Sequence, residues 1–504
     1  MAVNLFWRLL AAVVLRQSLL LWGKLCVVVV RCGLTVLPEN GKCRADFHER
    51  AMAKNFALTG TDLAEISGAG RRRFRVVVGI FYFMQGIVFG SWASRIPDIK
   101  AMLGMSEADL GSVLFAIPLG QLLAMPFSGW LTAKIGSRAC TGIAVAVYGL
   151  ALTLIALAAG TGSRAVFFAS LVFFGVCGNL HNIAINTQGV GVERIYGRSI
   201  MAGFHGVWSL AGFASGLIST TLVSAGISPV AHFAGVYAAC AILMAFLIRF
   251  AIPSDASKQE TVRELRENSA GKNPPRRRRF ALSDPFILLL GVICFVNMGC
   301  EGVMFDWSGV YFQQVVRPDE SLVRLGYTVA LGAMAAGRFV ADRFIMRFGQ
   351  VRVIQVCATM SACGLLLSVA LPQTATAAVG FMLVGFGISS IVPVCYSLSS
   401  RAENIPVGVA IASVSTIGFL GFLFGPPVIG HTAEFLGNLF ASDPAEAPSV
   451  GLRGAFLCAA FFALLSAVVA PKINKFISSS RGFSGASEAC VNCVREKNVD
   501  SGQQ

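Results

Sequence analysis

The chain has 504 residues, of which 55% are hydrophobic and only 13% are charged. Soluble domains average roughly 25% charged residues, so this composition excludes an ordinary water-soluble protein. The formal net charge is +15, and the basic residues lie in short loops between apolar runs. That placement is typical of membrane topology signals, and we expect no nucleic-acid partner.

Apolar runs close to the roughly 20 residues that cross a bilayer as a helix follow one another along the chain. Backbone groups in lipid must be satisfied within each segment, so we expect these runs to be helices. The predicted spans are 74–94, 110–132, 139–160, 165–189, 200–225, 229–251, 285–309, 325–345, 351–372, 376–398, 407–431 and 451–470. The sequence therefore predicts an all-α integral membrane protein with twelve transmembrane helices.

The stretch 252–284 is polar and basic, and it separates six spans from six. It predicts a cytoplasmic linker between two six-helix bundles, 74–251 and 285–471. We expect its Arg276–Arg279 run to lie at the anionic inner leaflet. The remainder, 472–504, is expected to be a cytoplasmic tail.

Lysines and arginines are concentrated in alternate loops, which sets the expected orientation. If the stretch before residue 74 faces the cytoplasm, the cytoplasmic loops are strongly basic and the outer loops are not. We therefore expect a multi-pass protein of the inner or plasma membrane with both termini in the cytoplasm.

Two pairs of glycines indicate that the halves are related. Gly111 and Gly136 are 25 residues apart, and Gly326 and Gly349 are 23 residues apart, around the second and eighth spans. A parallel repeat of six helices is a known transporter design. The pattern favours two pseudo-symmetric bundles.

Residues 1–73 do not fit this pattern, because their apolar stretch carries Arg8, Arg16 and Lys24. Three explanations are open for this stretch: a start assigned too far upstream, with Met52 as the natural beginning; a disordered extension; or a thirteenth span. The CxxC pair Cys490 and Cys493 has no second pair nearby, so we expect no metal and no cofactor.

The loop after the second span resembles a motif of the major facilitator superfamily. It reads Gly129-Trp-Leu131-Thr-Ala133-Lys134-Ile-Gly136-Ser-Arg138, and the family pattern is G-x-L-x-D-R-x-G-R-K/R. The resemblance implies the twelve-helix fold and makes these matching residues gating candidates: Gly129, Lys134, Gly136 and Arg138. Ala133 stands where the family has a carboxylate. Charges in the second half are expected to take its place: Arg338, Asp342 and Arg343.

Four further strings resemble a bacterial inner-membrane branch near the fucose permeases: GSWASRIPDIK (90–100), NIAINTQGVGVER (182–194), MAGFHGVWSLAG (201–212) and EGVMFDWSGVYF (301–312). In those permeases an acidic residue four positions before a helix-four asparagine serves proton coupling. Here Asn186 is that asparagine and Asn182 occupies the acidic position. The resemblance therefore does not carry over the same coupling site.

Charged residues inside spans are candidates for coupling, because each costs about 2.5–3.5 kcal/mol on insertion scales and therefore faces a cavity or a partner. Glu301 lies mid-span, with Asn297 one turn earlier on the same face, and Asp306 follows. Burial favours a protonated carboxyl, so Glu301 is a candidate for proton coupling; a carboxyl fixed by interhelical hydrogen bonds is the alternative. Arg338 and Asp342 are expected to pair near the cytoplasmic gate.

Polar and aromatic residues supply the remaining candidates. Asn179, Asn182 and Asn186 form a stripe that the resemblance directs into the cavity, and amide bonding between helices is the alternative. His205 and Trp208 lie one turn apart and could hold a sugar ring. Further binding candidates are Gln85, Ser390 and Tyr396. Interfacial anchoring is expected of Arg95, Trp307 and Tyr311, and packing or gating of His181 and Gln188.

These observations predict a secondary active transporter of a small polar solute, sugar-like or another metabolite, that is coupled to protons and works by alternating access. The expected partners are that solute, protons and the lipid bilayer, and the expected assembly is a monomer. A drug or metabolite efflux pump and a non-transporting receptor or scaffold are the alternatives. No HExxH or GxSxG motif occurs, so we expect no enzyme.

Overall fold

A computed structural model describes residues 68–196, 200–252, 284–402, 405, 407–474 and 476. Several predictions lie outside the described residues: those for Met52 and residues 1–67, for Arg276–Arg279 and most of the linker, for Cys490 and Cys493, and for the tail beyond 476. The described residues fold almost entirely into helices.

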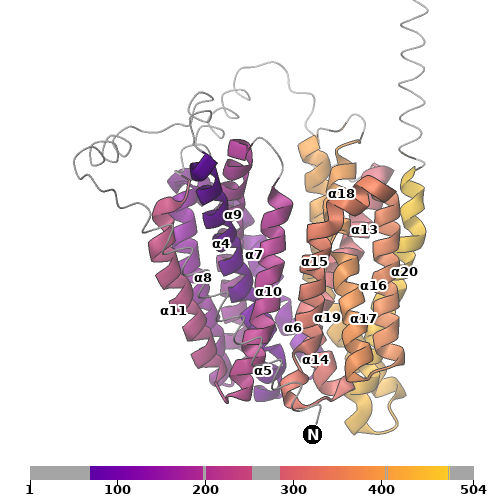
Figure 1. The fold of residues 1–504 in the computed structure, drawn as a ribbon. Helices are drawn as coiled ribbons and strands as arrows, with labels where there is room; N and C mark the ends of the chain where they lie inside the picture. Colours follow the sequence, from indigo (N-terminus) through magenta and orange to yellow (C-terminus); the bar gives the residue numbers. More distant parts are fainter. Residues whose placement is uncertain are drawn as a thin grey trace, which may run out of the picture. The chain divides into compact units, whose positions relative to one another are not determined.

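The first half, indigo to magenta in Figure 1, is a group of helices joined by short loops. Its elements are α4 (Gly68–Ala93), α5 (Ile96–Met102), α6 (Glu107–Leu114), α7 (Ala116–Ile135), α8 (Ser137–Gly160), α9 (Arg164–Tyr196), α10 (Met201–Ser224), α11 (Pro229–Leu247) and η1 (Ile248–Phe250). Helix α9 packs against α7 and α8, and α4 packs against α10.

The second half, orange to yellow in Figure 1, repeats this plan. Its elements are α13 (Pro285–Gly302), η2 (Val303–Trp307), α14 (Ser308–Tyr311), η3 (Phe312–Val316), η4 (Glu320–Leu322), α15 (Leu325–Phe348), α16 (Gln350–Ala370), α17 (Thr374–Ile388), α18 (Ile391–Ser399), α19 (Val407–Phe440), η5 (Pro444–Glu446), α20 (Ala447–Val469) and η6 (Ala470–Lys472). Helix α17 packs against α15 and α16, and α13 packs against α19.

Eleven helical segments of the described chain are long and apolar enough to cross a membrane. The remaining predicted span, 325–345, is α15, whose 24 residues extend about 36 Å. Its final turns carry several charges: Arg338, Asp342, Arg343 and Arg347. The predicted all-α membrane fold with twelve transmembrane helices is confirmed.

Large apolar side chains cover outward faces of the peripheral helices. Ile242 on α11 is 61% exposed, and Phe461 and Val468 on α20 are 62% and 64% exposed. Water would penalise such a surface, whereas lipid tails accept it. These faces are suited to the bilayer.

Three predicted spans are interrupted or extended in ways that the hydropathy pattern does not show. Phe115 separates α6 from α7, and Ser389 with Ser390 separates α17 from α18. The span that begins at Pro285 continues to Val316 through two π-helical segments, η2 and η3. Such π segments are frequent at functional sites, because they re-aim side chains within a helix.

The two glycines expected to correspond in the repeat have the same backbone conformation. Gly136, between α7 and α8, has φ 90° and ψ 151°, and Gly349, between α15 and α16, has φ 82° and ψ 156°. Side-chain-bearing residues rarely adopt positive φ, so both turns require glycine. Each half thus turns in the same way after its second transmembrane helix.

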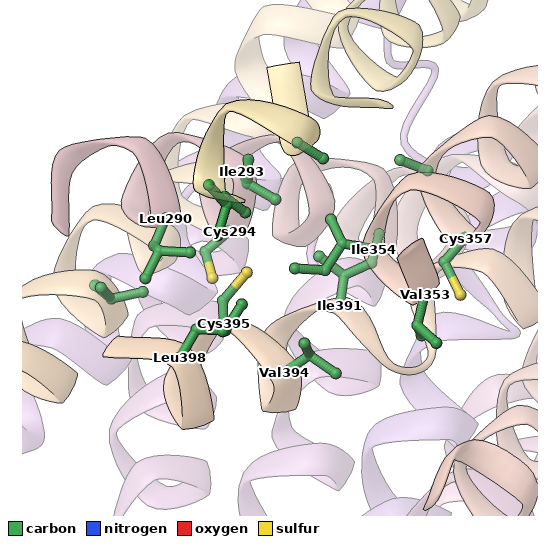
Figure 2. Packing of buried hydrophobic residues seen from close by; sticks show 14 of the residues in the cluster. Leu290, Ile293, Cys294, Val353, Ile354, Cys357, Ile391, Val394, Cys395 and Leu398 are labelled. Carbon is green, nitrogen blue, oxygen red and sulfur yellow. The ribbon is translucent and has the colours of Figure 1, made fainter. Parts of the chain in front are cut away.

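Buried apolar side chains from α13, α16, α18, α19 and α20 form the core at one end of the second half. Figure 2 shows part of it, with the sulfur atoms of Cys294 and Cys395 pointing toward each other. Both cysteines are fully buried and free. They act here as small apolar packing residues.

Helices α7 and α9 touch backbone to backbone where glycine allows it. A Cβ atom on Gly175 would lie 2.1 Å from the carbonyl oxygen of Ile117. The corresponding contact in the second half involves Gly385, whose Cβ would lie 2.1 Å from the carbonyl oxygen of Ala330. Close approach through small residues is the usual way in which membrane helices pack.

Gly175→Ala should therefore lower the thermal unfolding midpoint of the detergent-purified protein, with a cost of about 1–3 kcal/mol from overpacking. Gly79→Ala on α4 is the matched control, because an added Cβ there meets nothing within 4 Å. The control should be neutral or slightly stabilising, since alanine favours helix. Equal midpoints for the two variants would contradict the close contact.

Candidate functional site

A buried ion pair joins the last turn of α13, near the middle of the span Pro285–Val316, to the middle of α15. Arg338 donates from Nη2 to Oε1 of Glu301 at 3.1 Å. The two side chains are only 17% and 11% exposed. Charges withdrawn from water persist only with a partner, so each residue depends on the other.

The same guanidinium reaches into the first half. Its Nη1 donates to Oγ of Ser209 at 2.5 Å and to the backbone carbonyl of His205 at 3.4 Å. Both acceptors belong to α10, which packs along α15. The Glu301–Arg338 pair of the second half is therefore connected to the first half by hydrogen bonds.

The predicted pairing of Arg338 with Asp342 is wrong. Asp342 is exposed, and the ion-pair partner of Arg338 within the described chain is Glu301. One turn of α15 separates Asp342 from Arg338, and water screens a carboxylate there, whereas Glu301 offers a buried acceptor. Sequence spacing alone permits both pairings.

The asparagine stripe of α9 divides into two parts. Tyr82 of α4 donates to Oδ1 of Asn186 at 2.7 Å, and Nδ2 of Asn186 donates to Oδ1 of Asn182 at 2.8 Å. Asn179 is buried, and its Oδ1 has no hydrogen-bond donor among the described residues. Asn182 and Asn186 thus form hydrogen bonds within α9 and to α4. The side-chain oxygen of Asn179 is left as an acceptor for a ligand.

Equivalent amides lie on the first helix of each half. Nε2 of Gln85 on α4 is 3.5 Å from the carbonyl oxygen of Gly178, and Nδ2 of Asn297 on α13 donates to the carbonyl oxygen of Ile388 at 3.3 Å. Oδ1 of Asn297 is buried without a donor in the described part of the chain. Buried acceptors of this kind are normally satisfied, so a ligand hydroxyl suits this one.

Four rings from both halves form an aromatic cluster, defined as Phe89, Trp208, Phe305 and Phe422. Phe305 lies in the π segment η2 and contacts Phe89, Trp208 and Phe422 at centroid distances of 5.4, 5.7 and 6.2 Å. Phe89 and Trp208 also meet, at 5.8 Å. Ring faces of this kind can stack on a sugar or base.

The structure does not draw the other binding candidates into one group. His205 is exposed, and the centroid of its ring lies 5.4 Å from that of Tyr82 in an edge-to-face arrangement. Tyr396 donates to Oγ of Ser415 at 3.1 Å, which joins α18 to α19. Ser390 is buried and lies 3.1 Å from the hydroxyl of Ser389.

The gating candidates of the first half lie at the basic end, the end of the helices that carries Lys134, Arg138 and Arg347. Nζ of Lys134 lies 4.7 Å above the ring of Trp130, and Arg138 is half-buried. No ion pair within the described residues connects this loop, or Arg343, to the opposite half. A gating role for Gly129, Lys134, Gly136, Arg138 and Arg343 stays a prediction.

Polar contacts between the halves gather at the opposite end, called here the Asp98 end. Nη2 of Arg324 contacts both carboxylate oxygens of Asp98. The backbone amide of Ala108 donates to Glu434 at 3.1 Å. The halves are therefore joined by polar contacts at the Asp98 end and at the level of Arg338.

The expectation that Arg95, Trp307 and Tyr311 anchor the protein at the membrane surface is wrong. Trp307 and Tyr311 are 0% exposed, and Arg95 is 3% exposed. Trp307 lies at the end of η2, and Tyr311 of α14 donates to the carbonyl oxygen of Ser368 at 2.9 Å. His181 and Gln188 are buried as well, and their role in packing or gating stays a prediction.

With this architecture in place, comparison with known proteins identifies the family. Residues 77–402 match the family model described as Major Facilitator Superfamily. The chain belongs to the Major Facilitator Superfamily. An uncharacterized MFS-type transporter of Yersinia pestis is 32% identical over 360 residues, which is 71% of this chain and 89% of that protein.

Solved structures show the same fold at low sequence identity. The nucleoside transporter NupG has a TM-score of 0.60 and 14% identity, and the match covers 80% of this chain and 99% of that one. A D-xylose-proton symporter has a TM-score of 0.59 and 12% identity, with coverages of 79% and 97%. These neighbours share the fold, and the family match over residues 77–402 makes the chain a multi-pass membrane transporter of this superfamily rather than an enzyme.

Arg338→Gln should lower the thermal midpoint more than the double variant Glu301→Gln/Arg338→Gln does. Breaking one side of a buried pair leaves an uncompensated charge, at a cost of about 3–5 kcal/mol, whereas removing both charges avoids that cost. Asp342→Asn, which changes an exposed carboxylate on the same helix, should be nearly neutral. Additive effects of the two single variants would contradict the pairing.

Proposed function

We propose that this protein is a secondary active transporter of a small polar solute, sugar-like or another hydroxylated metabolite, coupled to protons through Glu301. The observation that carries the proposal is the Glu301–Arg338 ion pair, whose guanidinium also bonds Ser209 of the other half. A titratable group at that position can link proton binding to contacts between halves.

The coupling follows from the partners of Arg338. With Glu301 ionised, the guanidinium is held by a carboxylate on α13 and by neutral acceptors on α10. When Glu301 takes up a proton, Arg338 loses the negative charge that holds its guanidinium on α13. The hydrogen bonds of Arg338 to α10 and to water then contribute more to its position. A proton that binds one arrangement of the halves more tightly shifts the protein toward that arrangement.

The substrate class follows from the groups around this pair. The aromatic cluster supplies ring faces, and the buried amide oxygens of Asn179 and Asn297 supply acceptors for hydroxyl groups. Both suit a hydroxylated ring. The resemblance to the fucose permeases and the nucleoside and D-xylose named for the structural neighbours support the same class.

The positions of the contacts between the two halves support transport by alternating access. Asp98 and Arg324 hold them together at one end, while no ion pair between described residues of opposite halves occurs at the basic end. We assign the basic end to the cytoplasm from its lysines and arginines. The arrangement then corresponds to a state open to the cytoplasm, in a monomer of the inner or plasma membrane with both termini inside.

An efflux pump for cationic amphiphiles is the second candidate, because the aromatic cluster could equally pack an apolar ring or attract a cation. The transporter of a polar solute and the efflux pump differ in the substrate whose transport moves protons. Hydroxylated solutes would be active in the first case and cationic drugs in the second.

Glu301→Gln should abolish accumulation of substrate driven by a pH gradient in proteoliposomes yet leave substrate exchange between the two sides. An amide keeps the hydrogen-bonding shape of the carboxyl but cannot exchange a proton. Labelled sugars and nucleosides are the probes. Asp109→Asn is the control, since Asp109 pairs with Arg164 at a partly exposed site of the first half. Undiminished accumulation by Glu301→Gln would remove this residue from the mechanism.

A further inference from the structure

A buried group of charges at the Asp98 end has more cations than anions. Arg95 donates from Nη1 to Asp98 at 3.4 Å, from Nε to Nδ1 of His232 at 3.2 Å, and from Nη2 to the carbonyl oxygen of Ile227 at 2.8 Å. Arg324 of the second half contacts the same Asp98 carboxylate. One carboxylate therefore serves two guanidinium groups.

Both guanidinium groups are withdrawn from water. Arg95 is 3% exposed and Arg324 is 2% exposed. The neighbouring buried ions do not supply the missing charge, because Lys100 and Glu107 pair with each other at 3.0 Å. One positive charge thus stays without a counterion among the described residues, and burial makes such a charge costly.

Hydrogen-bond donors are unpaired at the same place. Nε and Nη1 of Arg324 are buried with no acceptor in the described part of the chain. His232 accepts from Arg95 through Nδ1, which places its ring proton on Nε2, and that atom is also buried without a partner. Arginine cannot lose its proton in a protein, so these donors require an acceptor from outside the chain.

We infer that the group formed by Arg95, Asp98, Arg324 and His232 binds one small monovalent anion of the size of chloride. The anion would balance the charge and accept from the unpaired guanidinium donors of Arg324. Since Arg95 and His232 belong to the first half and Arg324 to the second, an anion held between them would itself join the halves. If the proposed alternating access holds, bound anion would raise the population of the state that is closed at the Asp98 end.

The binding itself is tested without any substrate, by thermal unfolding of the detergent-purified full chain. The midpoint should rise in a saturable way as sodium chloride replaces sodium gluconate at constant ionic strength and pH, because a ligand that binds only the folded protein stabilises it. Gluconate is too large for the buried position and serves as the inert anion.

Three variants separate this site from general salt effects. Arg324→Gln leaves one guanidinium for one carboxylate, so the chloride response should disappear. Asp98→Asn leaves two guanidinium groups without a carboxylate, so the chloride concentration at half-effect should fall several-fold. Arg317→Gln is the matched control at the same end, where an exposed arginine pairs with Glu446 inside the second half; it should keep the native response.

Equal midpoints in chloride and gluconate for the native protein would overturn the proposal, and so would an undiminished chloride response in Arg324→Gln. If Arg324→Gln does not fold, binding of radioactive chloride to native protein decides, with one ion per chain expected and none contradicting. Proton uptake with sugars is measured separately, so a failure here leaves the proposed transport function intact.

Discussion

The requirement that a buried charge be paired organises the contact between α13, α15 and α10. Glu301 and Arg338 lie where lipid and packed helices exclude most water, and each makes the other tolerable. Because Arg338 also donates a hydrogen bond to Ser209, the ion pair lies at the contact between the two halves. Any change in the charge of Glu301 therefore alters the interactions of a guanidinium that also contacts the first half.

The internal repeat supplies the frame on which this asymmetry is built. Gly136 and Gly349 turn the chain identically, and Gln85 and Asn297 point their amides at equivalent backbone carbonyls. The charges do not repeat: α13 carries Glu301, whereas α4 has no carboxylate at mid-length. The repeat positions the helices, and charged residues that have no equivalent in the other half provide the candidate chemistry.

Sequence reasoning succeeded where a local signal sufficed. Apolar run length predicted the spans, and the rarity of carboxylates in such runs indicated that Glu301 would have a partner, which the structure shows to be Arg338. It failed where the answer depended on tertiary contacts. Arg338 could reach two carboxylates, and only the packing of α13 against α15 decides between them. The rings of Phe89, Phe305 and Phe422 are ordinary apolar residues until helices from both halves bring them together, and the π segment at Phe305 has no signature in hydropathy.

In the proposed mechanism, proton movement through this protein is coupled to a hydroxylated solute. Proton uptake into proteoliposomes, measured with a pH-sensitive dye against a panel of sugars, nucleosides, amino acids and cationic drugs, tests it most directly. We expect proton uptake with one class of hydroxylated ring solutes. Silence with every sugar and nucleoside, together with a signal from cationic drugs alone or from no compound, would contradict it.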